Sequence, residues 1–249
     1  MRNALSRAAF WSLLPLTAAQ GLWLRSRALR LPGADGARRG TLGAGADYHL
    51  LAMGDSIIDG VGTGSTEASL PVQFAAALAH AAGRRVHWRV EGASGDAISD
   101  LIRRVGRLQH DAPVDLVLIS VGVNDVTRLS STRHWRRSLH ALLGQLFDRW
   151  PGARVLFAGL PPMARFPLPP QPLRWSLGLR AATLDRLAEE VISGYANVDH
   201  VPTRIDPEHP GFCADGFHPS AESCTLWARE LASLQTGRTS KNEHHRGAA

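Results

Sequence analysis

Apolar and polar positions alternate in two kinds of block along most of the chain. Short runs rich in apolar and β-branched residues have the length and composition of strands and occupy residues 48–53, 85–90, 116–121, 153–158 and 197–201. Between and after these runs, apolar residues recur at helical spacing near 68–82, 97–110, 132–149, 175–193 and 220–234. This alternation predicts an α/β fold with a mostly parallel five-stranded sheet and right-handed crossovers.

Two of the expected strands contain uninterrupted apolar segments, which are Val117-Leu118-Ile119 and Val155-Leu156-Phe157. Such runs are typical of strands that helices cover on both faces. Ligands of open parallel sheets bind beyond the carboxyl ends of the strands. The loops that follow the strands are therefore the place to look for chemistry.

The first 30 residues form a separate apolar and basic segment. Residues 8–24 are mainly apolar, although Pro15 and Gln20 interrupt them, and arginines lie on both sides. Three interpretations remain open: an interfacial or single-pass membrane anchor with Trp11 and Trp23 at head-group level, a cleaved secretory signal, and a helix packed on the domain. The first two favour membrane association or export over a purely cytoplasmic location.

The remainder divides into a linker, one domain and a tail. Residues 31–46 are rich in glycine and are expected to form a linker, and residues 236–249 are polar and are expected to form a loose tail. Residues 47–235 then form one domain. A chain of 249 residues with 44% hydrophobic and 20% charged residues is long enough and apolar enough to bury a sizeable core.

The formal net charge of +6 comes from the N-terminal segment. Residues 1–44 contain seven arginines and one acidic residue, whereas the rest of the chain carries equal numbers of basic and acidic residues. A neutral domain without an RNA or DNA motif argues against a nucleic-acid partner. The basic segment is instead suited to anionic lipid head groups, so a membrane surface is the partner that it suggests.

Three residues carry the candidate nucleophilic chemistry. Ser56 follows the first expected strand, and Gly54 before it allows a tight turn. A serine needs a base, and a histidine held in one tautomer by a carboxylate is the usual one. Asp215 and His218 are three residues apart before the last helix, so one turn could bring the carboxylate onto the imidazole.

The oxyanion of an acyl-transfer intermediate needs hydrogen-bond donors. The backbone N–H of Gly95, the side-chain amide of Asn124 and the N–H of Ser56 are the candidates, again from loops that follow strands. Each of these short motifs alone is more often a turn or a helix cap. Their combination, in fixed order at one edge of the expected sheet, is more specific.

The chain resembles the SGNH, or GDSL-type, hydrolases, a family of esterases and lipases with four separated sequence blocks. The matching blocks are Met53-Gly54-Asp55-Ser56, Gly92-Ala93-Ser94-Gly95-Asp96, Gly122-Val123-Asn124-Asp125 and Asp215-Gly216-Phe217-His218-Pro219. The resemblance spans about residues 48–235 and implies a three-layer α/β/α sandwich of flavodoxin-like type. It also implies Ser56, Asp215 and His218 as the catalytic triad, and Gly95 and Asn124 as oxyanion donors.

One block departs from the family pattern. Many relatives carry asparagine at the head of the second block, where this chain has Val90-Glu91, which puts the choice of Gly95 over Gly92 in doubt. No metal and no organic cofactor is expected. The Gly60–Gly64 run lacks the last glycine of a dinucleotide loop, and the only lysine, Lys241, rules out a Walker motif.

The leading hypothesis is therefore a serine hydrolase that cleaves a small-molecule or lipid carboxylic ester through an acyl-enzyme. Alternatives are a deacetylase of acetylated sugars or cell-wall glycans, an acyltransferase and a non-catalytic lipid-surface module. The proline-rich stretch at 160–175 reads equally as an acyl-chain wall and as a rigid connection packed on the body. Arg128 and Arg133 are candidates for an anionic head group, and Cys213 and Cys224 are either two thiols or a disulfide bracing the last block.

Overall fold

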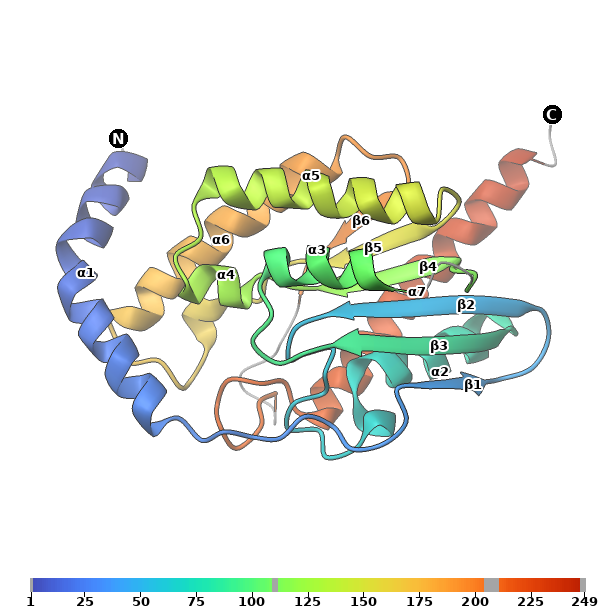
Figure 1. The fold of residues 1–249 in the computed structure, drawn as a ribbon, viewed down its shortest axis with the longest axis horizontal. Coiled ribbons are helices and arrows are strands. Elements are labelled where there is room, and N and C mark those ends of the chain that lie inside the picture. The colour runs from blue at the N-terminus through green and yellow to red at the C-terminus, as the bar shows by residue number, and fades with distance from the viewer. Residues whose placement is uncertain (1, 109–111, 204–210, 247–249) are drawn as a thin grey trace.

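A six-stranded sheet runs through the middle of the molecule, in a computed structural model that describes residues 2–108, 112–203 and 211–246 (Figure 1). The spatial order is β1-β3-β2-β4-β5-β6, and only β1 is antiparallel to its neighbour. The strands are β1 (Arg39–Leu42), β2 (Asp47–Gly54), β3 (Arg85–Gly92), β4 (Leu116–Ser120), β5 (Arg154–Ala158) and β6 (Val198–Val201). The mostly parallel sheet predicted from the sequence is confirmed.

The expected strand number, five, is too low by one. The additional strand β1 lies within residues 31–46, the stretch expected to be a linker. β1 is four residues long and largely exposed, and it pairs with β3 at the edge of the sheet. It has no buried side chains to leave a hydrophobic pattern, so backbone pairing alone identifies it.

Helices cover both faces of the sheet and complete a three-layer sandwich (Figure 1). Residues of α3, α5 and α6 share one buried cluster with the sheet, and residues of α2 and α7 share the other. The helices are α1 (Arg2–Arg27), α2 (Leu70–Ala82), α3 (Ile98–Arg107), α4 (Val123–Thr127), α5 (Thr132–Arg149), α6 (Leu173–Ile192) and α7 (Ala221–Arg246), with short 3-10 turns η1 (Thr66–Ala68) and η2 (Met163–Arg165).

Strand β4 shows why its apolar run is continuous. All five residues are buried, and successive side chains enter opposite layers. Ile119 belongs to the cluster with α3, α5 and α6, whereas Leu118 belongs to the cluster with α2 and α7. Because both faces are covered, the residues of Leu116–Ile119 are apolar at both alternate positions.

Helix α1 packs against the N-terminal end of α6, at the edge of the sheet where the parallel strands end (Figure 1). The side chain of Gln20 donates a hydrogen bond of 2.9 Å to the Gln171 carbonyl and accepts one of 3.1 Å from the Leu173 N–H. Leu24 contacts the main apolar cluster. Among the described residues, no helix has both the length and the apolar character needed to span a bilayer.

Helix α7 continues to Arg246, where the sequence suggested a loose tail from residue 236. The helix is anchored on the body by buried residues in its first half, including Trp227 and Leu231. The following polar residues extend it without an apolar stripe. Periodicity therefore gives no sign of this extension.

Candidate active site

Ser56 lies directly beyond the carboxyl end of β2 and is half-buried. The turn that presents it depends on Gly54, where an added Cβ would lie 2.0 Å from the carbonyl oxygen of Ser120. The Asp55 N–H donates to that same carbonyl at 3.1 Å. Close backbone contact between β2 and β4 thus fixes the start of the serine loop.

The structure brings Ser56, His218 and Asp215 together in one hydrogen-bonded chain. His218 Nε2 lies 3.0 Å from Ser56 Oγ, across 162 residues of sequence. His218 Nδ1 lies 2.6 Å from Asp215 Oδ2. The Asp215 side chain is 3% exposed, so its carboxylate meets the imidazole away from bulk water.

The loop before α7 holds Asp215 and His218 in this arrangement. The second carboxylate oxygen of Asp215 accepts hydrogen bonds from the N–H groups of Phe217 and His218, both at 3.0 Å. Gly216 between them has a φ of +64°, a conformation that glycine adopts at little cost. The Phe217 ring stands edge-on to the buried Phe166 ring, which ties the loop to the core.

Gly95 and Asn124 reach the same region from the loops after β3 and β4. Gly95 has a φ of +88°. Asn124, in α4, donates from Nδ2 to the carbonyl oxygen of Asp96 at 2.9 Å, which connects the two loops. The N–H groups of Ser56 and Gly95 have no hydrogen-bond acceptor among the described residues.

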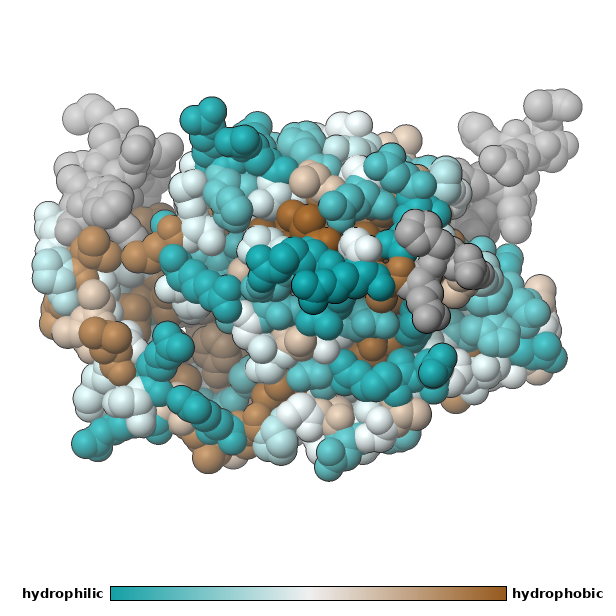
Figure 2. All heavy atoms as spheres, viewed as in Figure 1, coloured by the Kyte–Doolittle hydropathy of each residue, from teal (hydrophilic) through white to brown (hydrophobic). Residues whose placement is uncertain are grey.

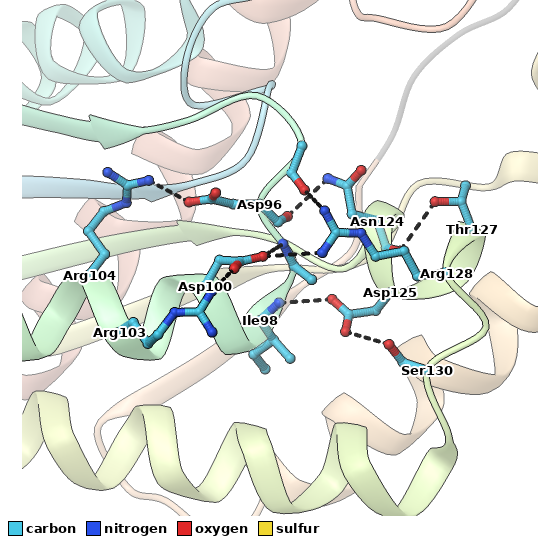
Figure 3. Close-up of polar contacts among 12 residues, drawn as sticks. Asp96, Ile98, Asp100, Arg103, Arg104, Asn124, Asp125, Thr127, Arg128 and Ser130 are labelled. Carbon is cyan, nitrogen blue, oxygen red and sulfur yellow. Dashed lines mark hydrogen bonds and ion pairs between the residues drawn. The ribbon is translucent and has the colours of Figure 1, made fainter. Parts of the chain in front are cut away.

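A polar network behind these donors fixes the loop that carries Gly95 (Figure 3). Arg128 donates to the Gly95 carbonyl at 2.7 Å and contacts the Asp100 carboxylate at 3.3 Å. Asp100 in turn accepts the Ala97 N–H at 2.9 Å. Buried Asp125 accepts the Ile98 N–H, also at 2.9 Å.

Arg128 was expected only as a candidate for an anionic head group, and no role was predicted for Asp100 or for Asp125, which was noted only as part of the third sequence block. The available signal was their position, because Asp125 and Arg128 lie within four residues of Asn124, and Asp100 lies five residues after Gly95. Their contacts depend on how β3 and β4 are placed. Spacing alone does not show them.

The electrostatic setting of the buried acids follows from their contacts. Burial raises the pKa of Asp55 to about 7, and only one of its carboxylate oxygens accepts a hydrogen bond within the described structure, from the Ile57 N–H. Burial also raises the pKa of Asp125. For Asp100, the hydrogen bond from Ala97 is the main cause of a lowered pKa, and the nearby guanidinium groups add to it.

The two cysteines near the last block are free thiols. Cys213 donates from Sγ to the Pro219 carbonyl at 3.2 Å. Cys224 is buried, and burial raises its pKa to about 12. The structure therefore corresponds to the two-thiol alternative.

A cavity of about 750 Å³ opens beside His218, Asp215, Gly95 and Asn124. The proline-rich stretch both lines this cavity and packs on the core. Leu168, Pro169 and Leu173 line the cavity. Leu160, Met163 and Phe166 are buried in the core.

No group of three or more potential metal ligands occurs in the part of the chain that the structure describes. The Gly60–Gly64 run forms turns beside residues 32–35. A Cβ at Gly60 would lie 2.7 Å from the Ala34 side chain, so this glycine serves close packing of the chain on itself.

A serine, a histidine and a carboxylate at the carboxyl edge of a parallel sheet form the arrangement that serine hydrolases use. The GDSL-like Lipase/Acylhydrolase family matches residues 52–224, and the chain belongs to this family. A GDSL-like esterase of Mycobacterium tuberculosis is 29% identical over 191 residues, which make up 73% of this chain. The match spans 60% of the length of that esterase.

Solved structures with the same fold include several carbohydrate esterases. A carbohydrate acetylesterase from Sinorhizobium meliloti has a TM-score of 0.58 and 20% identity, covering 76% of this chain and 99% of its own. An acetylxylan esterase from Geobacillus stearothermophilus has a TM-score of 0.55 and 20% identity, covering 77% and 94%. A family two carbohydrate esterase from Clostridium thermocellum, in complex with cellohexaose, has a TM-score of 0.62 and 16% identity, covering 78% and 65%.

Proposed function

We propose that the protein hydrolyses carboxylic esters, with Ser56 as the nucleophile. The observation that carries the proposal is the unbroken chain from Ser56 Oγ through His218 to Asp215, with distances of 3.0 and 2.6 Å. A serine hydroxyl becomes a competent nucleophile when a positioned base can take its proton. Membership of the GDSL-like family supports the same activity.

The proposed mechanism has two half-reactions. His218 takes the proton of Ser56 as Oγ attacks the ester carbon, and Asp215 stabilises the resulting imidazolium. The imidazolium then protonates the leaving alcohol, which leaves an acyl group on Ser56. Water, deprotonated by the same histidine, attacks this acyl-enzyme and releases the acid.

The oxyanion of each tetrahedral intermediate is assigned to three donors. The N–H groups of Ser56 and Gly95 donate to no acceptor among the described residues, so both can serve as oxyanion donors. The amide nitrogen of Asn124 carries two protons, and the Asp96 carbonyl takes one of them. The other proton completes the set. No metal or cofactor takes part in this scheme.

Two substrate classes fit this chemistry. Acetylated sugars are the substrates named for the structural neighbours from Sinorhizobium and Geobacillus, and they remain the alternative here. Leucine is the most frequent residue type lining the cavity beside His218, and leucine side chains suit an apolar group better than a hydroxyl-rich one. A purely lipid-binding role is less well supported, because such a role needs no connected triad.

A membrane surface is the partner that we propose for α1. Leu16 and Trp23 are exposed on this helix by 51% and 54%, and Arg25 and Arg27 follow in its last turn. This combination is typical of helices that lie in the head-group region. Sedimentation with anionic vesicles should be lost in a Leu16→Gln, Trp23→Gln variant, and equal sedimentation of both proteins would contradict this role.

Hydrolysis of p-nitrophenyl esters tests the activity itself. Wild-type protein should release nitrophenol from at least one ester of an acyl series, and Ser56→Ala should lower kcat by several orders of magnitude. An acetylated oligosaccharide is assayed beside the series to separate the two substrate classes. Activity of Ser56→Ala equal to that of wild type would show that Ser56 is not the nucleophile.

A further inference from the structure

The cavity next to the triad is lined by residues from distant parts of the chain, among them α1, α6 and the loop before α6. Helix α1 lies beside the start of α6 in Figure 1. Hydrophobic residues gather along this side of the molecule in Figure 2. The apolar side chains that line the cavity include Leu14, Leu24, Leu168, Leu173, Leu177 and Phe217.

The size of the cavity exceeds what a small acyl group requires. Its volume of about 750 Å³ lies within the range that accommodates ligands of drug size, roughly 300–1,000 Å³. An acetyl group would leave most of this apolar surface in contact with water. A longer hydrocarbon chain would cover it, and the burial of each methylene group is favourable.

Helix α1 is fixed in place by specific contacts. Gln20 bonds through both ends of its amide, accepting from the Leu173 N–H and donating to the Gln171 carbonyl. The accepted bond satisfies an N–H in the first turn of α6 that has no partner within its own helix. Thr17, one turn before Gln20, is only 5% exposed.

We propose that α1 is the specificity wall of the active site and that the acyl chain of the substrate lies between α1 and α6. The preferred substrates are then esters of medium-length or long, unbranched fatty acids. This inference rests on the proposed ester hydrolysis and names its substrate class. The acyl carbon sits at Ser56, with the chain extending past Asn124 towards Leu24 and Leu177.

Gly21 offers a way to fill the cavity without disturbing the triad. Gly21 lines the cavity from α1, and a Cβ built there meets no atom within 4 Å. Replacement of a glycine inside a helix also favours the helical conformation. Gly21→Ala, Gly21→Leu and Gly21→Phe therefore form a graded series of increasing side-chain volume.

Gly106 in α3 provides the matched control. It is an exposed glycine within a helix, a Cβ there also meets no atom within 4 Å, and it does not line the cavity. Gly106→Phe adds the same side chain on a different surface. Its acyl-length profile should remain that of wild type.

The experiment measures kcat/KM for p-nitrophenyl acetate, butyrate, octanoate and laurate. Each step along the Gly21 series should shorten the longest chain that is accepted, and Gly21→Phe should lose about tenfold or more on octanoate and laurate, because each methylene that no longer fits costs on the order of tenfold. Acetate hydrolysis should stay within about twofold. Profiles that are unchanged, or lowered equally for every ester, would overturn the proposal.

Two further arms separate this inference from the proposed function. Acetate esters of alcohols of increasing length test the alcohol side, and a Gly21 effect confined to that series would overturn the acyl assignment. Thermal unfolding with added decanoate is a readout that needs no turnover. Decanoate should raise the Tm of wild type and Gly106→Phe but not of Gly21→Phe, even if no ester is hydrolysed. Equal Tm shifts in all three proteins would overturn the proposal that α1 forms the specificity wall.

Discussion

Arg128 holds the backbone of Gly95 through a hydrogen bond of 2.7 Å from Nη2 to the Gly95 carbonyl oxygen. The N–H of the same residue, Gly95, is the group that we assign as a hydrogen-bond donor to the oxyanion. Nη1 of the same guanidinium contacts the Asp100 carboxylate, which accepts a hydrogen bond from the Ala97 N–H. Arg128 is thus a positioning residue, and its effect on catalysis passes through the orientation of Gly95.

We predict that Arg128→Ala lowers kcat about tenfold, because the N–H of Gly95 that serves as oxyanion donor is misplaced. Arg128→Lys should recover part of the loss. Arg103 is the matched control, since it contacts the same Asp100 carboxylate but not Gly95. Equal losses in Arg103→Ala and Arg128→Ala would point to a structural effect through Asp100 instead.

Asn124→Ala removes an oxyanion donor together with the hydrogen bond to the Asp96 carbonyl. Loss of one such donor typically lowers kcat by about 10²–10³. Steady-state kinetics on the best ester should show this loss in kcat more than in KM. A variant with full kcat would remove Asn124 from the site.

Asp215→Asn tests the orientation of the histidine. The amide oxygen can still accept from the Phe217 and His218 N–H groups, so the loop should keep its shape. The amide nitrogen, however, faces His218 Nδ1 as a donor and favours the wrong tautomer. We predict a fall in kcat of roughly 10³–10⁴ with an unchanged Tm. A large drop in Tm would instead show that Asp215 mainly supports the loop.

Asp55 should make stability depend on pH in a defined window. Its pKa rises from 3.8 to about 7 on folding, so the folded protein keeps a proton that the unfolded chain releases. The contribution to stability is complete below about pH 4 and is lost as the pH rises towards 7, with a size on the order of 2–4 kcal/mol.

Urea unfolding of wild type and Asp55→Asn across this range measures that contribution. The asparagine variant carries no titrating proton, so its free energy of unfolding should fall less than that of wild type between pH 4 and 7. Parallel curves for the two proteins would show that the pKa of Asp55 is not raised in the folded state.

One physical reason explains why both the layers of the fold and the candidate triad could be predicted from the sequence. Buried parallel strands require continuous apolar runs, such as that of β4, and catalytic loops follow those strands at one edge. Ser56 and His218 are 162 residues apart in sequence, yet both loops were expected at that edge, and the structure brings their side chains together.

The missed features share a different cause. Strand β1 pairs through its backbone and has only one partly buried apolar side chain, Leu42, and the end of α7 has a polar sequence, so neither has an apolar pattern. The position of α1 over the cavity depends on the amide of Gln20 reaching a loop 151 residues away. Contacts of this kind depend on three-dimensional placement, and spacing along the chain does not encode them.

The most direct test of the central claim is the covalent trapping of Ser56. A fluorophosphonate forms a stable adduct with a serine activated by a neighbouring base, and mass spectrometry of peptides locates the adduct. We predict one adduct per chain on Ser56 in wild type, none in Ser56→Ala, and strongly slowed labelling in His218→Ala. An adduct on another serine, or labelling that does not depend on His218, would contradict the account.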